Sequence, residues 1–294
     1  MNAPRSTVFR GSRSDFLSAL LAMESGIDPD RFPWYVENFD QMAMAYAAVE
    51  APGRIARHDV TGARVEERIT VREYFNRLGV LHLFDETHPL SIKNMQYHST
   101  NALGFIGYQF GEAVLISSGY YEPARVAVLL DGKREWVDSY YIGEIPDKVW
   151  ARGVRQVPHR LEGRDVMILA TDVNSWKGKF TGKNGVSTLD DLKSGKKQDV
   201  IMSDILLMNE ATLLSLLRDP GMLVFPERIQ GGHSKITLSG ILAAAHLCGA
   251  WGVAKYLNSG VVSADEFGTS ILLYLQKFSG YELHPVNCLD SPSL

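Results

Sequence analysis

A glutamate closes the first strongly helical segment of the chain. Residues 15–24 place apolar side chains at helical spacing, and Gly26 and Pro29 end the helix directly after Glu24. Because the carboxyl then lies beside an apolar flank, loss of contact with water disfavours its charged form and raises its pKa. General acid catalysis at neutral pH requires a carboxyl that stays protonated. Glu24 is therefore the first catalytic candidate, the alternative being a solvated residue at a helix end.

Two later glycine-rich segments carry isolated polar side chains. Residues 104–111 include Tyr108 and Gln109, and their glycines allow another chain or a polymer to approach the backbone closely. Tyr108 and Gln109 could bond to a sugar, or the segment could simply enter a core helix. Residues 240–252 are small and apolar, with His246 as the polar group in the middle. A lone histidine in such a helix is either a hydrogen-bonded core residue or a ligand-binding one.

In this order, the three segments resemble the lysozyme-like superfamily, and lytic transglycosylases and related bacterial muramidases most of all. In that family a Glu-Ser pair carries the catalytic acid, a Gly-x-x-Gln motif follows, and a small-residue helix of the Ala-Ala-Tyr-Asn-Ala-Gly kind comes later. Glu24-Ser25 corresponds to the first motif, Gly107-Tyr108-Gln109 to a shortened second motif, and residues 244–249 to the third. His246 stands where the third motif has tyrosine.

The resemblance implies cleavage of the bond between N-acetylmuramic acid and N-acetylglucosamine, with Glu24 giving a proton to the leaving oxygen. A hydrolase of this kind usually has a second carboxylate. Glu37 is the first choice because it follows the aromatic pair Trp34-Tyr35, and Asp40 and Glu112 are the second and third choices. If none of them faces the substrate, the resemblance implies a transglycosylase that uses the sugar's own N-acetyl group.

Four side chains are expected to bind the substrate. Aromatic faces and polar groups line saccharide sites, but most aromatic residues in a chain with 12 Phe, 12 Tyr and 5 Trp belong to the core. The choice therefore falls on Tyr108, Gln109, His246 and Tyr35. No phosphate loop, dinucleotide motif or Gly-x-Ser-x-Gly elbow occurs, so no cofactor is expected. No metal is expected either, since no zinc pattern matches the spacing of His82, His88 and His98.

These residues must be positioned by secondary-structure elements, and the sequence pattern predicts a mainly α fold of the α+β class. The resemblance implies a lysozyme-like helical core. Ser14 is the expected N-cap of the first helix. Further helices are expected within residues 31–50, 70–84, 110–117, 147–154, 199–217, 238–257 and 270–278, short strands near 126–130, and a loop over 221–232. Residues 1–13 are expected to form a flexible arm and 14–294 a single domain. The long separation of Glu24 from Gln109 indicates an insertion over residues 40–98.

Composition excludes several classes of protein. The chain has 294 residues, 45% of them hydrophobic and 22% charged, which is ordinary for a globular protein with a sizeable core. The formal charge of −4 and the absence of a long basic run argue against a general nucleic-acid binder. No signal peptide or membrane span is expected, and residues 236–257 are interpreted as a buried helix. Cys248 is expected to be a buried thiol, and a disulfide with Cys288 is left open.

The main hypothesis is a peptidoglycan glycosidase. Without a signal peptide, such an enzyme would be made in the cytoplasm and carried by a phage or a secretion machine, for example as a type VI secretion effector acting in the periplasm of a target cell. An immunity protein would then be a partner. The alternatives are a non-catalytic lysozyme-like component of a phage tail or secretion system, and a hydrolase of the chitinase or chitosanase kind.

Overall fold

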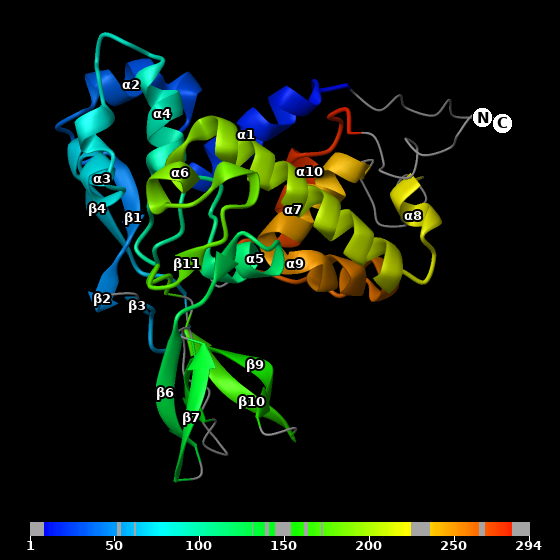
Figure 1. Cartoon of the computed structure of the whole chain (residues 1–294). Coiled ribbons are helices and arrows are strands. Elements are labelled where there is room, and N and C mark those ends of the chain that lie inside the picture. The colour runs from blue at the N-terminus through cyan, green and yellow to red at the C-terminus, as the bar shows by residue number, and fades with distance from the viewer. Residues whose placement is uncertain are drawn as a thin grey trace, which may run out of the picture. The chain divides into compact units, whose positions relative to one another are not determined.

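The fold is mainly helical, with additional strands (Figure 1). The computed structural model describes residues 9–51, 54–61, 63–130, 132–138, 141–144, 154–161, 164–171, 173–224, 236–264 and 268–283. Two compact units divide the chain, where the sequence predicts a single domain over residues 14–294. Unit 1 consists of residues 1–23 and 199–294, and unit 2 of residues 24–198.

Unit 1 is built from helices. They are α1 (Arg13–Ser25, as far as residue 23), α7 (Gly195–Leu216, from residue 199), α8 (Gly221–Val224), α9 (Leu238–Ser259) and α10 (Ile271–Lys277). Ser12, rather than the predicted Ser14, caps α1. The Ser12 amide and hydroxyl donate to the Asp15 carboxylate at 2.8 Å, and the Asp15 amide donates back to the Ser12 hydroxyl at 3.3 Å. This reciprocal pairing needs an acid three residues after the cap, and Ser14 has none there.

The first described residues of unit 1 are joined to its last ones. The Arg10 amide donates to the Gly280 carbonyl, and the Glu282 amide donates to the Gly11 carbonyl, both at 2.9 Å. The Phe16 ring packs edge-on against Phe278 and Tyr281, with ring centroids 6.0 and 5.7 Å apart. The predicted flexible arm over 1–13 is therefore wrong for residues 10 and 11, because backbone pairing holds them. Residues 1–8 lie outside the described part of the chain.

Small residues let α9 pack closely against α10. A Cβ on Gly240 would lie 2.5 Å from the Leu275 carbonyl oxygen, and the Ser239 hydroxyl donates to the Phe278 carbonyl at 2.6 Å. Gly249 interrupts α9 with a φ of 70° and a ψ of 160°, a conformation that essentially only glycine adopts. Among the helices that the structure describes, α9 is long and apolar enough to span a membrane, but 61% of its apolar window is buried inside the protein.

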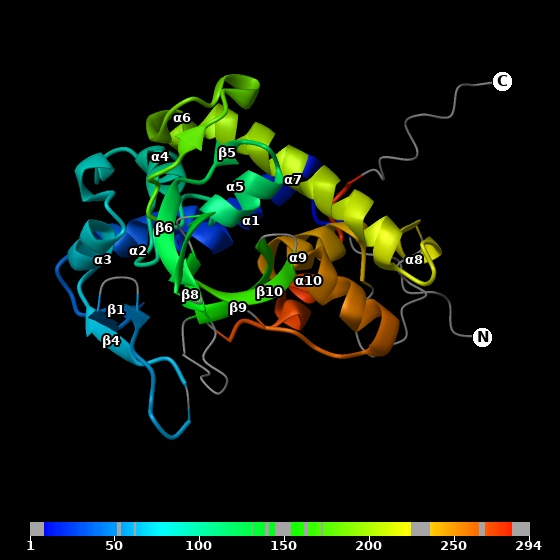
Figure 2. The same ribbon diagram turned by 60° about the horizontal axis from the view of Figure 1, so that its bottom comes forward.

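Unit 2 begins with short helices and strands that share one core. The elements are η1 (Pro29–Arg31), α2 (Phe32–Glu37), β1 (Met44–Ala47), β2 (Val49–Ala51), β3 (Arg54–Ile55), β4 (Glu66–Ile69), α3 (Val71–Arg77), η2 (Leu81–Leu83) and α4 (Ser91–His98). Ile27, Tyr35, Phe75, Val80 and Met95 are among the buried residues of this core. Figures 1 and 2 both show α2, α3 and α4 gathered together, in blue and cyan. The predicted insertion over 40–98 therefore supplies much of the core that follows Glu24.

Residues 44–51 form strands, where the sequence predicts a helix. β1 pairs antiparallel with β4, with Met44 opposite Ile69 and Ala47 opposite Glu66. Met44 and Ile69 are both buried, so pairing across the hairpin outweighs the helix preference of Met and Ala. The predicted helices within 70–84 and 110–117 are confirmed as α3 with η2 and as α5 (Glu112–Ser117).

The remaining strands of unit 2 follow α5. β5 (Tyr121–Glu122) pairs with β11 (Lys179–Phe180), β6 (Arg125–Leu130) pairs with β7 (Lys133–Asp138), and β10 (Arg164–Thr171) lies between β8 (Tyr141–Glu144) and β9 (Val154–Leu161). β6 confirms the strand predicted near 126–130. The helix predicted over 147–154 lies outside the described residues except for Val154, which begins β9. Unit 2 ends with η3 (Lys183–Gly185), α6 (Leu189–Lys193) and the first residues of α7.

Candidate functional site

Glu24 and Ser25 end α1, and both are buried, with exposed fractions of 9% and 2%. Gly26 follows with a φ of +70°. The Tyr74 hydroxyl donates to the Gly26 carbonyl at 2.8 Å, and a Cβ on Gly26 would lie 2.4 Å from that hydroxyl. Only glycine fits both the backbone conformation and the space. The turn after the predicted acid is thus fixed by a contact 48 positions along the chain.

Gln109 holds the backbone of Glu24. Its amide Nε2 donates to the Glu24 carbonyl at 2.6 Å, and its Oε1 accepts from the Asn101 amide at 2.7 Å. Asn101 in turn accepts from the backbone amides of Leu103 and Phe105 at 2.9 and 3.1 Å. Gln109 has a φ of +60°, which is rare for a residue with a long side chain. The structure therefore brings together two of the predicted site residues, Glu24 and Gln109.

Tyr108 lies in the core of unit 2. Its side chain is fully buried, and its ring packs against Tyr97 and Phe110 with centroids 6.3 and 5.7 Å away. The predicted contact with a sugar is therefore wrong for this residue. Positive φ angles at both Gly107 and Gln109 reverse the local chain direction, so that Tyr108 enters the core and Gln109 reaches Glu24.

Tyr35 is also a core residue rather than a sugar-stacking one. It is fully buried, packs against Phe75 with ring centroids 5.2 Å apart, and its hydroxyl accepts from the Asp28 amide at 3.0 Å. Burial raises the pKa of this hydroxyl. Gln96 donates to the Ile27 carbonyl at 2.7 Å. Tyr35 and Gln96 therefore fix the loop after Glu24 from two sides, which corrects the predicted role of Tyr35.

The three candidates for a second carboxylate lie in different environments. Glu37 is exposed at the end of α2. Asp40 is exposed and accepts two hydrogen bonds from the Arg72 guanidinium, at 2.7 and 3.3 Å, which hold its pKa below the usual value. Glu112, at the start of α5, has an exposed fraction of 3%. Only Glu112 is buried, although the sequence ranks it third.

Glu112 ties residues 174–176 to the start of α5. Its Oε1 accepts hydrogen bonds from the Trp176 amide and the Ser175 hydroxyl, and its own amide donates to Asn174 Oδ1 at 2.6 Å. Its Oε2 is buried and has no hydrogen-bond partner among the residues that the structure describes. A buried carboxylate oxygen without a donor is costly, so this geometry is held by its surroundings.

Trp176 contacts Glu112 and is not among the residues selected from the sequence. Its φ is +53°, its indole Nε1 donates to the Gly104 carbonyl at 2.9 Å, and the residue is partly exposed. Phe180 lies nearly parallel to it, with ring centroids 6.1 Å apart and an interplanar angle of 9°. The aromatic and glycine-rich composition of residues 171–185 was a signal of this arrangement, but the contact with Glu112 spans 64 positions and leaves no local pattern.

His246 lies on α9 in unit 1 and is half-buried. It belongs to a different unit from Glu24, so its predicted contact with the substrate stays a prediction. Cys248 directly precedes the kink of α9 at Gly249. It is half-buried and forms no disulfide with any described residue. Cys288 lies outside the described part of the chain.

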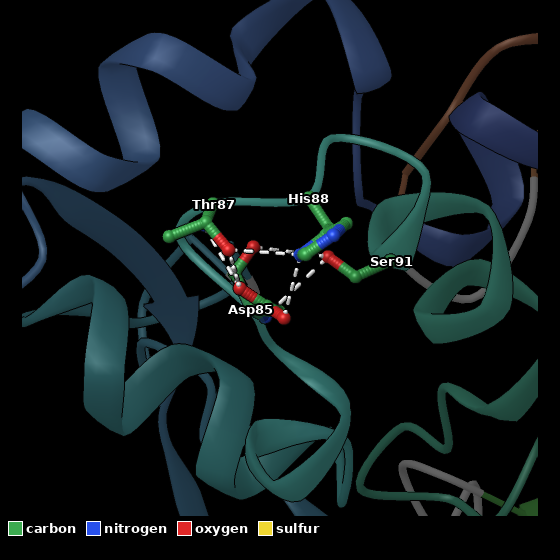
Figure 3. Close-up of polar contacts among 4 residues, drawn as sticks. All are labelled: Asp85, Thr87, His88 and Ser91. Atoms are coloured by element: carbon green, nitrogen blue, oxygen red, sulfur yellow. Dashed lines mark hydrogen bonds and ion pairs between the residues drawn. The ribbon is translucent and has the colours of Figure 1, made fainter.

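A separate polar cluster precedes α4 (Figure 3). Asp85 accepts hydrogen bonds from Thr87 at 2.7 Å and pairs with His88 Nδ1 at 2.9 Å, and the Ser91 hydroxyl contacts the Asp85 backbone. His88 is largely exposed, and the cluster closes the turn that leads into α4. Within the described ranges, no three His, Cys, Asp or Glu side chains are grouped so that they could hold a metal ion.

The chemistry available at the site follows from these contacts. A mostly buried glutamate ends a helix, and Gln109, Tyr74 and Gln96 hold its own carbonyl and the backbone that follows it. Such a group can give or take a proton at a defined position. No protein family, curated protein or solved structure matches this chain.

Proposed function

We propose that the protein is a peptidoglycan glycosidase in which Glu24 is the general acid. The observation that carries the proposal is the hydrogen bond from Gln109 to the Glu24 carbonyl, which joins two motif residues 85 positions apart. A proton donor must be held in a fixed position to act in a transition state. The buried side chain of Glu24 and the anchored turn after it meet this requirement.

In the proposed reaction, the protonated Glu24 carboxyl gives its proton to the glycosidic oxygen between N-acetylmuramic acid and N-acetylglucosamine. The bond from the anomeric carbon to that oxygen breaks, and positive charge develops on the sugar. The resulting Glu24 carboxylate then accepts a proton from the attacking hydroxyl. If that hydroxyl belongs to water, the product has a reducing end. If it belongs to the sugar itself, the product is an anhydro-sugar.

Glu37 remains the proposed second carboxylate. Asp40 is occupied by Arg72, and Glu112 by Trp176, whereas Glu37 is exposed. If Glu37 takes no part, stabilisation of the charge by the substrate's own N-acetyl group is the remaining route, as in a transglycosylase. Export to the periplasm of a target cell, with an immunity protein as partner, belongs to the same proposal.

The test is digestion of purified sacculi by the wild-type protein and by Glu24→Gln. The substitution keeps the shape of the side chain but removes the acid, so we expect activity to fall at least ~100-fold, the range for loss of a general acid. Glu86→Gln, at an exposed position in the turn before α4, is the matched control and should keep full activity. Thermal unfolding of each variant shows whether the fold is intact.

Mass spectrometry of the products separates the routes. Reducing ends mean hydrolysis, and anhydro-muropeptides mean transglycosylation. A Glu37→Gln variant that still hydrolyses at the wild-type rate would remove Glu37 from the mechanism. Full activity in Glu24→Gln would overturn the proposal. Turnover of chitin or chitosan in place of sacculi would favour the other class of hydrolase, and no turnover by the folded protein would favour a non-catalytic component.

A further inference from the structure

Trp176 has a backbone conformation that a bulky side chain rarely adopts. Its φ of +53° lies in the left-handed region, and such outliers persist only where the surroundings determine them and are concentrated at functional sites. The residue before it and the residue after it are both exposed, so its own partial burial does not come from a position deep in the core. The strain therefore calls for an account of what this ring does.

Four contacts hold Trp176, one of them the edge of the Tyr121 ring, whose centroid lies 5.6 Å away at an interplanar angle of 81°. The buried Glu112 carboxylate accepts the Trp176 backbone N–H, the Gly104 carbonyl accepts the indole N–H at 2.9 Å, and Phe180 lies parallel to the indole ring. Both N–H groups are satisfied, and the residue as a whole is partly exposed. A rigid, partly exposed aromatic surface is what remains, and it loses little conformational entropy when a ligand binds.

The same hydrogen-bond network leads to Glu24. Gly104, which accepts from Trp176, lies between Leu103 and Phe105, and both of their amides donate to Asn101. Asn101 donates to Gln109, and Gln109 donates to the Glu24 carbonyl. One short loop of unit 2 thus contacts both the indole and the backbone of the proposed acid.

Two lysines lie between the two aromatic residues in the sequence. Lys177 and Lys179 are exposed, and Gly178 between them donates to the Tyr121 hydroxyl at 2.6 Å. A Cβ on Gly178 would lie 2.1 Å from the Glu122 carbonyl oxygen, so this segment is packed closely against β5. The two exposed lysines thereby flank a glycine whose backbone is held against β5.

We propose that Trp176 and Phe180 form a stacking platform for an N-acetylated hexosamine ring of the glycan strand, and that Lys177 and Lys179 bind acidic groups carried on that strand. This inference rests on the proposed function and names the residues that would select its substrate. The C–H face of a pyranose ring packs against an indole, and carboxylates of a lactyl group or a stem peptide are attracted to ammonium groups. Glu112 is the positioning residue that holds the platform.

The test measures binding, not turnover, in the full-length Glu24→Gln protein. The probes are tetra-N-acetylchitotetraose, which is uncharged, and soluble glycan strands that carry stem peptides. In Trp176→Ala we expect the Kd for both probes to rise at least 10-fold by calorimetry, and in Trp176→Phe we expect a smaller rise. Trp136→Ala is the matched control, because Trp136 is an exposed tryptophan in the same unit. The Kd of this variant for both probes should equal that of the protein with Trp136 intact.

A second pair of readouts keeps the test decisive if Trp176→Ala does not fold. In the protein that keeps Trp176, the indole N–H resonance of this residue should shift as tetra-N-acetylchitotetraose is added. Lys177→Gln together with Lys179→Gln should weaken binding of the peptide-bearing strands and leave binding of the uncharged probe unchanged. An unchanged Kd in a folded Trp176→Ala variant, or an indole resonance that does not move, overturns the platform even if Glu24→Gln has abolished turnover.

Discussion

At the scale of single residues, one amide side chain connects the two ends of the candidate site. Gln109 donates to the Glu24 carbonyl and accepts from Asn101, and a sequence motif was enough to select both Gln109 and Glu24. The same motif put Tyr108 on the wrong side of the loop. Spacing identifies which residues are unusual, but the direction of each side chain follows from φ angles at Gly107 and Gln109 that the spacing does not contain.

Gln109→Ala is therefore expected to affect both stability and activity. The substitution removes two partly buried hydrogen bonds, to the Glu24 carbonyl and from the Asn101 amide, which should lower the free energy of unfolding by about 2 kcal/mol. The backbone cost of a positive φ is similar for Gln and Ala, so it cancels. Urea unfolding gives the stability, and digestion of sacculi, under the proposed function, should slow because the backbone of Glu24 is no longer held.

Gln41→Ala is the control for this prediction. Gln41 is exposed, and its backbone bonds to Asn38 and Ala43, which the substitution leaves in place. Its loss should change the free energy of unfolding by less than about 0.5 kcal/mol. Equal effects of the two substitutions would mean that the Gln109 hydrogen bonds do not hold the site.

At the scale of elements, helices with a clear apolar face could be predicted, and hairpins made of helix-forming residues could not. The prediction within 199–217 was confirmed by α7, and that within 270–278 by α10, whose cap Ser270 accepts from the Leu272 amide at 3.2 Å. β1 was missed because its strand conformation comes from pairing with β4, more than twenty residues later. Local propensity contains no information about such a partner.

The start of α6 gives a prediction about pH. The Lys197 ammonium, followed by backbone and hydroxyl donors from Ser187 and Thr188, lowers the pKa of Asp191 to about 2. The ionised carboxylate therefore stabilises the fold above the unfolded-state pKa of about 4, and this stabilisation is lost as the pH falls from about 4 to about 2. The Tm of Asp191→Asn should be below that of the wild type at neutral pH, and the difference should shrink through this window.

Asp190→Asn provides the comparison in the same turn. Asp190 is exposed, and the capping box is formed by Thr188 and Asp191. Its Tm should follow the wild-type curve from pH 5 to pH 2. A difference between Asp191→Asn and the wild type that stays constant down to pH 2 would contradict the role of the ionised carboxylate.

At the scale of the whole molecule, the division into two units could not be predicted from the sequence. Unit 2 is one continuous stretch with its own core, whereas unit 1 combines residues from both ends of the chain. Phe16 meets Phe278 and Tyr281 across more than 260 positions, and an apolar residue at helical spacing does not reveal which distant helix it will pack against. The two units are visible only once these contacts are known.

This division predicts which helices lose hydrogen-exchange protection when a residue near the N-terminus is substituted. Phe16 is fully buried, so Phe16→Ala should cost about 3–5 kcal/mol through lost contacts and an unfilled cavity in unit 1. Hydrogen exchange followed by mass spectrometry should show faster exchange in α10 than in the wild type, although more than 250 positions separate it from the substitution. α3, in unit 2, should keep more of its protection.

Leu273→Ala, at a half-exposed position on α10 itself, should disturb exchange less than Phe16→Ala does. Equal loss of protection in α3 and α10 would mean that the chain unfolds in a single cooperative step. The two units would then differ in their internal contacts but would not unfold separately.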